Sequence, residues 1–346
     1  WRGHIRFSTG GNKRRSFLNV NVINCHAVQL WRRVGRLGCG AKLIAGCCVI
    51  KGHSPGSRPI QFADIISALV PKDRTSRRVA GGLSYGAGPR RKLDLYGPRQ
   101  RGETPLPVVV FFYGGAWNSG SRTYYGFAAR ALAAMGYLVV VPDYRLVPEI
   151  EYPAFVKDCA AAMAWVSDHI AAYGGDPARL VLAGHSAGAY NAACLALDPR
   201  WLGPELRNAI VGLIGLSGPY DFYPFDGPIS QRVFGKADNP RQTQPINHVG
   251  PDAVPTLLVS GERDRLVLPR NSVNLSAALQ AFGVPATLRL YPRLGHAGIL
   301  FCLSLPLRWM APVLKDCRAF LAEVTNPGMG PGDPSAGEHR AAAARQ

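Results

Sequence analysis

The sequence predicts an α/β fold built on a mostly parallel central sheet with helices on both faces. Three observations lead to this prediction. Short apolar runs lack the alternation of a half-exposed strand, they alternate along the chain with segments of helical spacing, and glycine-rich turns follow several of them. Strands buried on both faces read as continuous apolar runs, and alternation of strands with helices is typical of parallel sheets.

The first expected elements run from residue 91 to residue 173. Residues 91–96 alternate and end at Gly97-Pro98, as an antiparallel hairpin strand should. Residues 108–113 form a continuous apolar run that Gly114-Gly115 ends, and residues 137–141 form a second one. Helical spacing is found at 124–135 and at 153–173, where Gly174-Gly175 closes an amphipathic pattern.

The later elements repeat the same pattern. A strand at 180–183 leads into a glycine-flanked serine and a helix that reaches about residue 196. Three more buried strands are expected at 209–216, 256–260 and 287–291, and a helix at 307–324 closes the domain. The connection from Ser217 to Pro255 is long and rich in Pro, Gly, Asp and aromatic residues, so we expect it to form part of a substrate pocket or a small cap.

The basic charge of the chain is concentrated at its beginning. The net charge is +18 over 346 residues, but residues 1–60 contain eleven Lys or Arg and no Asp or Glu, which leaves +7 for the rest. We expect a disordered basic leader at 1–60, a catalytic domain at 61–325 and a flexible Gly, Pro and Ala-rich tail at 326–346. No basic stripe interleaved with aromatics follows the leader, which argues against a nucleic-acid partner.

The cysteines and the hydropathy pattern indicate the cellular setting. No Cys-x-x-Cys pair of metal or redox spacing occurs, and Cys159 and Cys194 lie in alanine-rich helical patterns, where a free thiol is usually a small buried hydrophobe. A reducing, cytoplasmic location is the expectation. The best apolar stretch, Leu37 to Ile50, is short and contains Lys42, so no membrane span is predicted.

The candidate nucleophile is Ser186. It lies in Gly-His-Ser-Ala-Gly at 184–188, directly after the expected strand at 180–183. Glycines on both sides permit a sharp turn from strand to helix that lifts the serine hydroxyl out of the sheet. A serine needs a base, an acid and oxyanion donors to react, so the motif predicts chemistry only together with those groups.

The candidate base and acid follow later strands. His296, in Leu-Gly-His-Ala-Gly at 294–298, lies in a loop expected after the last strand, where an imidazole can reach the serine. Asp264 lies in the turn after the strand at 256–260 and can fix the imidazole tautomer. Glu262 is a close competitor for the acid and Asp221 a weaker one.

The other histidines fit the role of base less well. His169 belongs to a predicted helix, His185 lies inside the serine turn and His248 is in the irregular connection, whereas His4, His26, His53 and His339 fall in the expected leader and tail.

The candidate oxyanion donors are backbone N–H groups. Gly114 and Gly115 follow a predicted central strand and allow close approach of the backbone to a ligand, and Ala187 follows the serine. We therefore assign the N–H groups of Gly114, Gly115 and Ala187 to this role.

The order of serine, acid and histidine along the chain resembles the α/β-hydrolase superfamily. The resemblance is to its esterase and lipase branch, related to hormone-sensitive lipase, small bacterial carboxylesterases and arylformamidases. The matching stretches, between about residues 80 and 300, are Ser-Tyr-Gly at 84–86, Leu-Asp-Leu-Tyr at 93–96, Tyr-Gly-Gly-Ala-Trp at 113–117, Asp-Tyr-Arg-Leu at 143–146, Gly-His-Ser-Ala-Gly at 184–188, Ser-Gly-Pro-Tyr-Asp at 217–221, Gly-Glu-Arg-Asp at 261–264 and Gly-His at 295–296.

One residue departs from the family pattern. The family usually has His before the two glycines, where this chain has Tyr113. That side chain generally braces the oxyanion loop, so the change bears on loop geometry and substrate preference. Asp143 and Arg145 are interpreted as a structural pair.

The resemblance implies a serine hydrolase that cleaves short-chain or aryl carboxylic esters with no metal or organic cofactor. Tyr113, Trp117, Tyr220 and Phe222 are candidates for an apolar substrate pocket. An arylformamidase acting on N-formylkynurenine-type amides is the near alternative, and a catalytically silent ligand-binding protein of the same fold is the alternative from another class. A small-molecule ester is the expected partner, and the oligomeric state stays open.

Overall fold

An eight-stranded sheet forms the centre of the part of the chain that the structure describes. The computed structural model describes residues 70–326, so the predicted leader and all of the predicted tail but its first residue lie outside the described residues. The strands are β1 (Ser76–Ser84), β2 (Lys92–Pro98), β3 (Leu106–Phe112), β4 (Leu138–Pro142), β5 (Gly175–His185), β6 (Ile210–Leu216), β7 (Thr256–Gly261) and β8 (Ala286–Tyr291).

The strand order in the sheet is β1-β2-β4-β3-β5-β6-β7-β8. β2 pairs antiparallel with both β1 and β4, and every pairing from β4 to β8 is parallel. The predicted mostly parallel sheet and its antiparallel strand near residues 91–96 are therefore confirmed. The carboxyl ends of β3, β5, β6, β7 and β8 lie at one edge, where ligands bind in sheets of this kind.

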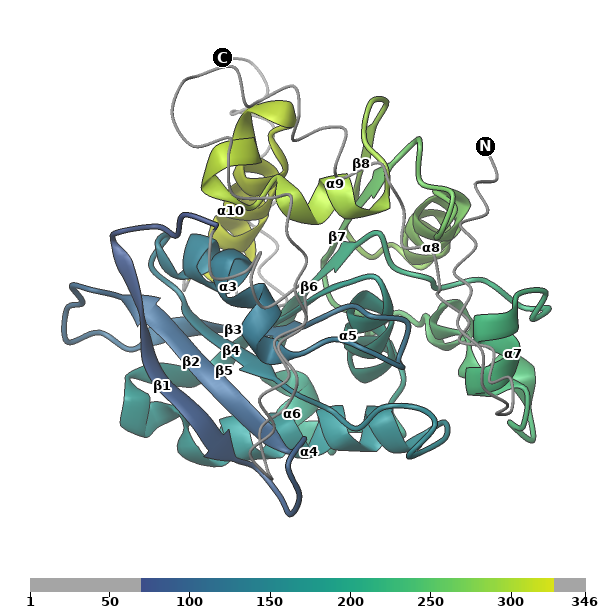
Figure 1. Cartoon of the computed structure of the whole chain (residues 1–346), viewed down its shortest axis with the longest axis horizontal. Coiled ribbons are helices and arrows are strands. Elements are labelled where there is room, and N and C mark those ends of the chain that lie inside the picture. The colour runs from purple at the N-terminus through teal and green to yellow at the C-terminus, as the bar shows by residue number, and fades with distance from the viewer. Residues whose placement is uncertain (1–69, 327–346) are drawn as a thin grey trace, which may run out of the picture. The chain divides into compact units, whose positions relative to one another are not determined.

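Helices cover the sheet on both sides (Figure 1). On one face α3 (Gly126–Ala133) packs with α10 (Val313–Val324), and on the other α4 (Ala154–His169) packs with α5 (Ala187–Leu197). The remaining helices of residues 70–326 are η1 (Arg122–Tyr125), η2 (Ile170–Tyr173), α6 (Pro204–Asn208), α7 (Pro228–Phe234), η3 (Pro240–Thr243), η4 (Pro245–His248), α8 (Arg270–Ala281), α9 (His296–Phe301) and η5 (Leu305–Met310). This is the layered α/β arrangement that the sequence predicts.

Two local predictions are wrong. The predicted helix 307–324 is split into η5 and α10, because Ala311 precedes Pro312 and adopts an extended backbone with φ −164° and ψ 150°. A residue before proline is disfavoured in the helical region. His296 was expected in a loop, but it is the first residue of α9, after the N-cap Gly295.

The turn from β5 to α5 brings backbone segments unusually close together. Ser186 has φ 55° and ψ −125°, a conformation that costs energy for a residue with a Cβ. A Cβ on Gly188 would lie 2.1 Å from the carbonyl oxygen of Phe112, and one on Gly184 would lie 2.3 Å from that of Gly188. The first turn of α5 can therefore lie against the end of β3 only because both positions are glycine.

A buried carboxylate ties the residue before β2 and the segment after β4 to α4. The side chain of Asp158, in α4, is fully buried, and its two oxygens accept hydrogen bonds from Arg91 and Arg145 at 2.8–3.0 Å. Burial alone would raise the pKa of Asp158, but the hydrogen bonds from Arg145 and Arg91 outweigh it and hold the pKa below its usual value. The ion pair therefore stabilises the fold while the carboxyl group is ionised.

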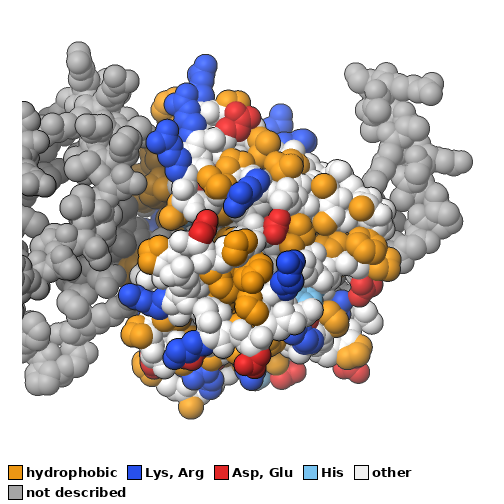
Figure 2. All heavy atoms as spheres, turned by 90° about the vertical axis from the view of Figure 1, so that its right-hand side faces the viewer, with side chains coloured by type: hydrophobic (Ala, Val, Ile, Leu, Met, Phe, Trp, Pro, Cys, Tyr) orange, Lys and Arg blue, Asp and Glu red, His pale blue; other side chains and the backbone are white. Residues whose placement is uncertain are grey.

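The face that carries α7 and α8 exposes several large apolar side chains, including Tyr223, Ile229 and Val273. Figure 2 shows this face, where apolar side chains are interspersed with charged side chains of both signs. Within residues 70–326, none of the helices has the length and apolar character that crossing a bilayer requires.

Replacing Gly188 by alanine should disrupt the β5–α5 turn. The new methyl group would overlap the backbone at Phe112, so we expect a loss of about 3 kcal/mol or more in the free energy of unfolding. Gly203→Ala is the matched control, because among the described residues no atom beyond its two chain neighbours lies within 4 Å of its added Cβ, and it should change stability by less than about 0.5 kcal/mol. Urea unfolding measures both, and equal stabilities of the two variants would contradict the close approach.

Replacing Asp158 by asparagine should destabilise the protein in a pH-dependent way. Because the pKa of Asp158 is lowered on folding, its contribution is complete above the unfolded pKa, about 3.9, and is lost as the pH falls through the lower folded value. We expect a cost of about 3 kcal/mol at pH 7 that shrinks below about pH 4.

The control for this variant is Asp252→Asn, which breaks an ion pair whose carboxylate is 72% exposed and should cost less than about 1 kcal/mol. Urea unfolding from pH 7 to pH 3 compares the two. A cost for Asp158→Asn that stays constant down to pH 3 would argue against the ionised buried pair.

Candidate active site

Three chemically competent side chains meet at the carboxyl edge of the sheet. Ser186 stands between β5 and α5, Asp264 lies three residues after the end of β7, and His296 starts α9 after β8. Their positions follow from the topology, because parallel strands deliver the residues after them to the same edge.

The three side chains form a continuous hydrogen-bonded line. His296 Nε2 lies 2.8 Å from Ser186 Oγ, and His296 Nδ1 lies 2.7 Å from Asp264 Oδ2. A carboxylate only accepts, so the Nδ1–H donates to Asp264 and Nε2 is left to accept the hydrogen bond of the Ser186 hydroxyl. Such an arrangement can remove the hydroxyl proton as the serine attacks an electrophile.

The carboxylate of Asp264 is buried and fixed by the backbone. Its Oδ1 accepts hydrogen bonds from the N–H groups of Leu266 at 3.0 Å and Val267 at 2.9 Å, which leaves Oδ2 for His296. The competing carboxylates are placed differently, since Glu262 is exposed and Asp221 Oδ2 accepts a hydrogen bond from Asn274 at 2.7 Å.

The competing histidines within the described residues do not contact Ser186 Oγ. His169 is exposed and stacks on Trp165 with ring centroids 4.8 Å apart, and a nitrogen of His248 lies 2.9 Å from the carbonyl oxygen of Gln242. His185 is buried beside His296, but its two ring nitrogens lie next to the Tyr125 hydroxyl and the His296 carbonyl oxygen. The other four histidines lie outside the described residues.

The loop after β3 presents free backbone N–H groups beside Ser186. Gly115, Ala116 and Trp117 have φ of 140°, 51° and 57°, so three consecutive residues adopt the left-handed region. Among the described residues no acceptor is found for the N–H groups of Gly115 and Ala116, both of which are partly exposed. Ala187 opens α5, and the N–H of a first helical residue has no intrahelical partner.

Gly114 does not have the role predicted for it. It is buried, and its N–H donates to the hydroxyl of Tyr125 at 3.0 Å, so it has no free donor for an oxyanion. Ala116, whose N–H has no acceptor among the described residues, was not among the predicted donors. Its left-handed backbone carried no sequence signal, because such a conformation favours glycine and this residue is not one.

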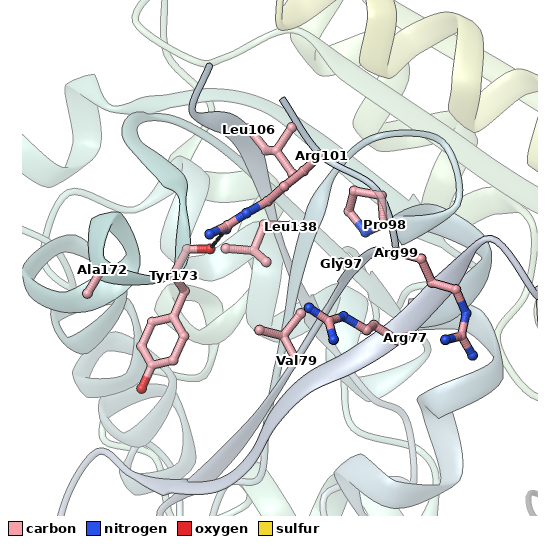
Figure 3. A pocket seen from close by; sticks show the side chains of 10 residues that line it. All are labelled: Arg77, Val79, Gly97, Pro98, Arg99, Arg101, Leu106, Leu138, Ala172 and Tyr173. Carbon is pink, nitrogen blue, oxygen red and sulfur yellow. Dashed lines mark hydrogen bonds between the residues drawn. The ribbon is translucent and has the colours of Figure 1, made fainter. Parts of the chain in front are cut away.

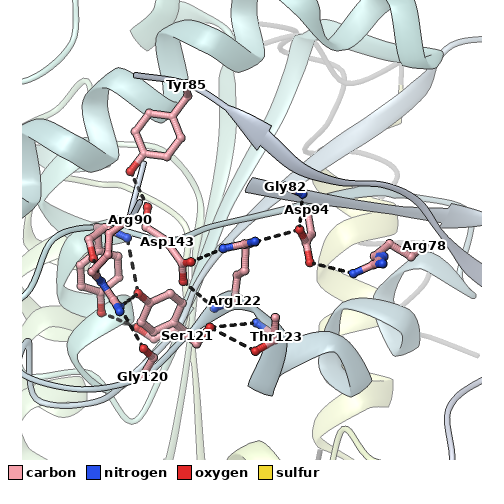
Figure 4. A network of polar contacts seen from close by, with 12 residues as sticks. Arg78, Gly82, Tyr85, Arg90, Asp94, Gly120, Ser121, Arg122, Thr123 and Asp143 are labelled. Atoms are coloured by element: carbon pink, nitrogen blue, oxygen red, sulfur yellow. Dashed lines mark hydrogen bonds and ion pairs between the residues drawn. The ribbon is translucent and has the colours of Figure 1, made fainter. Parts of the chain in front are cut away.

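The fully buried side chain of Tyr113 supports this loop from the protein interior. Its hydroxyl accepts a hydrogen bond from Arg90 at 2.7 Å. Arg90 also donates to the carbonyl oxygens of Gly120 and Tyr144, each at 2.9 Å, as Figure 4 shows for Gly120. Tyr113 thus contributes to the support of the loop and cannot line a substrate pocket.

Asp143 and Arg145 each form an ion pair, but not with each other. Arg122 donates to Asp94 at 2.8 Å and to Asp143, both of which are buried (Figure 4). Arg145 pairs with Asp158 instead. The expected Asp143–Arg145 pair is therefore wrong, because each residue has a partner distant in sequence.

Aromatic side chains pack behind the oxyanion loop. Trp117 is 5% exposed, stacks on the partly exposed Phe222 with centroids 6.4 Å apart, and donates from Nε1 to Asn191 at 3.1 Å. Phe234, on α7, meets Trp117 edge to face, so the connection 217–255 packs against this loop. Tyr220 is fully buried and belongs to the core, which leaves Phe222 as the predicted pocket residue with an accessible surface.

A small cavity lies at the opposite edge of the sheet (Figure 3). Leu106 and Leu138, which line it, are the first residues of β3 and β4, whereas Ser186 follows the last residue of β5. Because these three strands are parallel, the cavity is not part of the candidate active site.

Solved structures of esterases share the fold. A truncated carbohydrate esterase from gut microbiota superposes with a TM-score of 0.64 at 22% identity, over 74% of this chain and 99% of that one. Esterase B from Lactobacillus Rhamnosis also gives a TM-score of 0.64, at 20% identity, over 75% of this chain and 90% of that one.

Sequence comparison finds curated relatives with esterase names. Isoprenylcysteine alpha-carbonyl methylesterase ICME of Arabidopsis thaliana is 32% identical over 294 residues, 77% of this chain and 65% of that protein. Carboxylesterase NlhH of Mycobacterium tuberculosis is 32% identical over 220 residues, 58% of this chain and 69% of that protein. The chain spans only 36% of the length of a probable ICME of Oryza sativa, to which it is 38% identical over 152 residues, 42% of this chain.

A family model covers the centre of the domain. It is the BD-FAE model, and it matches residues 93–279, just over half of the chain and including Ser186 and Asp264. The chain belongs to the BD-FAE family, within the esterase and lipase branch of the α/β-hydrolases.

Proposed function

We propose that this protein hydrolyses carboxylic esters through a serine-bound acyl intermediate. The observation that carries the proposal is the line from Ser186 Oγ to His296 Nε2 at 2.8 Å and from His296 Nδ1 to Asp264 Oδ2 at 2.7 Å. The esterase names of the relatives support the same chemistry.

In the first step Ser186 Oγ attacks the ester carbonyl carbon while its proton moves to His296 Nε2. Asp264 stabilises the imidazolium that forms. The N–H groups of Gly115, Ala116 and Ala187 hold the negative carbonyl oxygen. The carbonyl re-forms as the bond to the alcohol breaks, and His296 returns its proton to the departing alcohol oxygen.

In the second step water attacks the acyl-serine. His296 accepts a proton from the water as its oxygen bonds to the acyl carbon, and the same N–H groups hold the oxyanion. Collapse breaks the bond to Ser186, which regains its proton from His296, and releases the carboxylic acid. In both steps His296 accepts the proton and then returns it.

The substrate class is inferred from the aromatic side chains that pack against the loop after β3. Phe222, which stacks on the buried Trp117 ring, offers an apolar surface next to the loop that contains the N–H groups of Gly115 and Ala116, which have no acceptor within residues 70–326. A short-chain or aryl ester suits such a site. Methyl esters belong in the substrate panel because relatives are named as methylesterases.

Removing the serine hydroxyl should abolish hydrolysis. Ser186→Ala is expected to lower kcat for p-nitrophenyl acetate at least about 10⁴-fold, and Asp264→Asn about 10³-fold to 10⁴-fold, because the histidine then loses its oriented tautomer. Glu262→Gln is the control, since it changes an exposed carboxylate two residues from Asp264 and should retain wild-type kcat. Initial rates at saturating substrate measure the three variants.

One outcome would overturn the proposal, and another would change the residue assigned as the acid. Hydrolysis by Ser186→Ala at the wild-type rate would show that Ser186 is not the nucleophile. A lower kcat in Glu262→Gln with an unchanged kcat in Asp264→Asn would show that Glu262, not Asp264, is the acid. Running N-formylkynurenine beside p-nitrophenyl acetate, p-nitrophenyl butyrate and a prenylcysteine methyl ester tests the bond type. Faster cleavage of the formamide would identify an amidase.

A further inference from the structure

A buried chain of hydrogen bonds connects the oxyanion loop to His296 by a route that avoids Ser186. The N–H of Gly114 lies 3.0 Å from the hydroxyl oxygen of Tyr125, and that hydroxyl lies 3.2 Å from His185 Nδ1. The other ring nitrogen, His185 Nε2, lies 3.3 Å from the backbone carbonyl oxygen of His296. Three segments that are distant in sequence are thereby joined.

The chemistry of the two ends sets the direction of every bond in this chain. A carbonyl oxygen only accepts, so His185 must carry its proton on Nε2 to bond His296. Nδ1 of a neutral ring is then an acceptor, and the Tyr125 hydroxyl donates to it while accepting from the Gly114 N–H. Each polar group has one partner of the correct kind, which is the condition for a stable buried network.

The neutral state of His185 is consistent with its surroundings. Burial lowers the pKa of His185 to about 3, with the neighbouring His296 acting in the same direction. Burial also raises the pKa of Tyr125, so its hydroxyl stays protonated and can donate. Both nitrogens of His185 are occupied, and the ring therefore has no free position for proton transfer to a substrate.

Aromatic rings pack against the residues of this hydrogen-bond chain. The Tyr125 ring packs against Phe111 and Tyr113, with centroids 5.9 Å away in each case, and the His185 and His296 rings are 4.9 Å apart. Close packing on all sides restricts sideways motion of the bonded groups. A displacement of the Gly114 backbone is therefore transmitted through Tyr125 and His185 to the backbone of His296.

We propose that Tyr125 and His185 are positioning residues that set the oxyanion loop and His296 at a fixed distance from each other across Ser186. Gly114 directly precedes the candidate donors Gly115 and Ala116, and the carbonyl of His296 belongs to the candidate base. The inference rests on the proposed function, because both ends act on the same transition state. Hydrolysis requires the two to be correct together, so a link between them affects the rate more than substrate binding.

The test uses variants that break single bonds of the chain. Tyr125→Phe removes the hydroxyl that joins Gly114 to His185. His185→Gln keeps a donor near the position of Nε2 and loses the acceptor for Tyr125, whereas His185→Asn keeps that acceptor and loses the donor to His296. Tyr137→Phe is the matched control, because it removes a buried hydroxyl that lies 3.5 Å from Thr325 Oγ1, at the far end of α10.

Each of the three network variants is expected to lower kcat for p-nitrophenyl acetate about tenfold to hundredfold, with KM within about twofold of wild type. Tyr137→Phe should retain the wild-type kcat. The double variant Tyr125→Phe with His185→Gln should lose no more than the worse single one, because both break the same link. Wild-type kcat in Tyr125→Phe, or losses that multiply in the double variant, would overturn the proposal.

A spectroscopic measurement tests the network without activity. In ¹⁵N-histidine-labelled full-length protein at pH 7, His185 should be neutral with its proton on Nε2, and the resonance is assigned by its loss in His185→Gln. A proton on Nδ1, or a charged ring, would contradict the chain. If Ser186→Ala hydrolyses as fast as wild type, the proposed function fails whatever this spectrum gives; if Ser186→Ala is inactive and Tyr125→Phe is not impaired, only the positioning role fails.

Discussion

The structure depends on the contact between the first turn of α5 and the end of β3. Gly188 lies so near the carbonyl oxygen of Phe112 that no side chain fits between them, and a Cβ on Gly114 would lie 2.9 Å from the Cβ of Ser186. This approach places the serine hydroxyl, the N–H of Ala187 and the loop after β3 around one point. The residues that follow β7 and β8 complete the site from the other side.

The loop after β3 is stiffened from two directions by buried polar groups. Arg90 holds Tyr113 and Gly120 on one side, and Tyr125 with His185 holds Gly114 on the other. Donors that are fixed before the substrate arrives stabilise developing charge without reorganising, which is where most of the electrostatic contribution to catalysis arises. The left-handed backbone at Ala116 and Trp117 lies between these contacts, and Trp117 is itself held by the hydrogen bond that its carbonyl oxygen accepts from the Val147 N–H and the one that its Nε1 donates to Asn191.

Much of this could be predicted from the sequence, because apolar runs and their glycine-rich ends report on burial and topology. The Gly-His-Ser-Ala-Gly motif, together with the order of Ser186, Asp264 and His296 after three of the predicted strands, selects three side chains that lie within hydrogen-bonding distance of their neighbours in the line. Pro312 indicates a break, but the apolar spacing continues on both sides of it, and the sequence therefore predicted one helix at 307–324.

The rest depends on contacts between distant residues. No local pattern says that the Gly114 N–H meets Tyr125, that Asp143 pairs with Arg122, or that Tyr113 and Tyr220 are core residues. The central claim is that Ser186 reacts covalently, and mass spectrometry of protein treated with an alkyl phosphonate ester tests it most directly. One adduct on the peptide containing Ser186, lost in Ser186→Ala and slowed in Asp264→Asn, is the predicted result; a folded protein left unlabelled, or labelled elsewhere, would contradict the account.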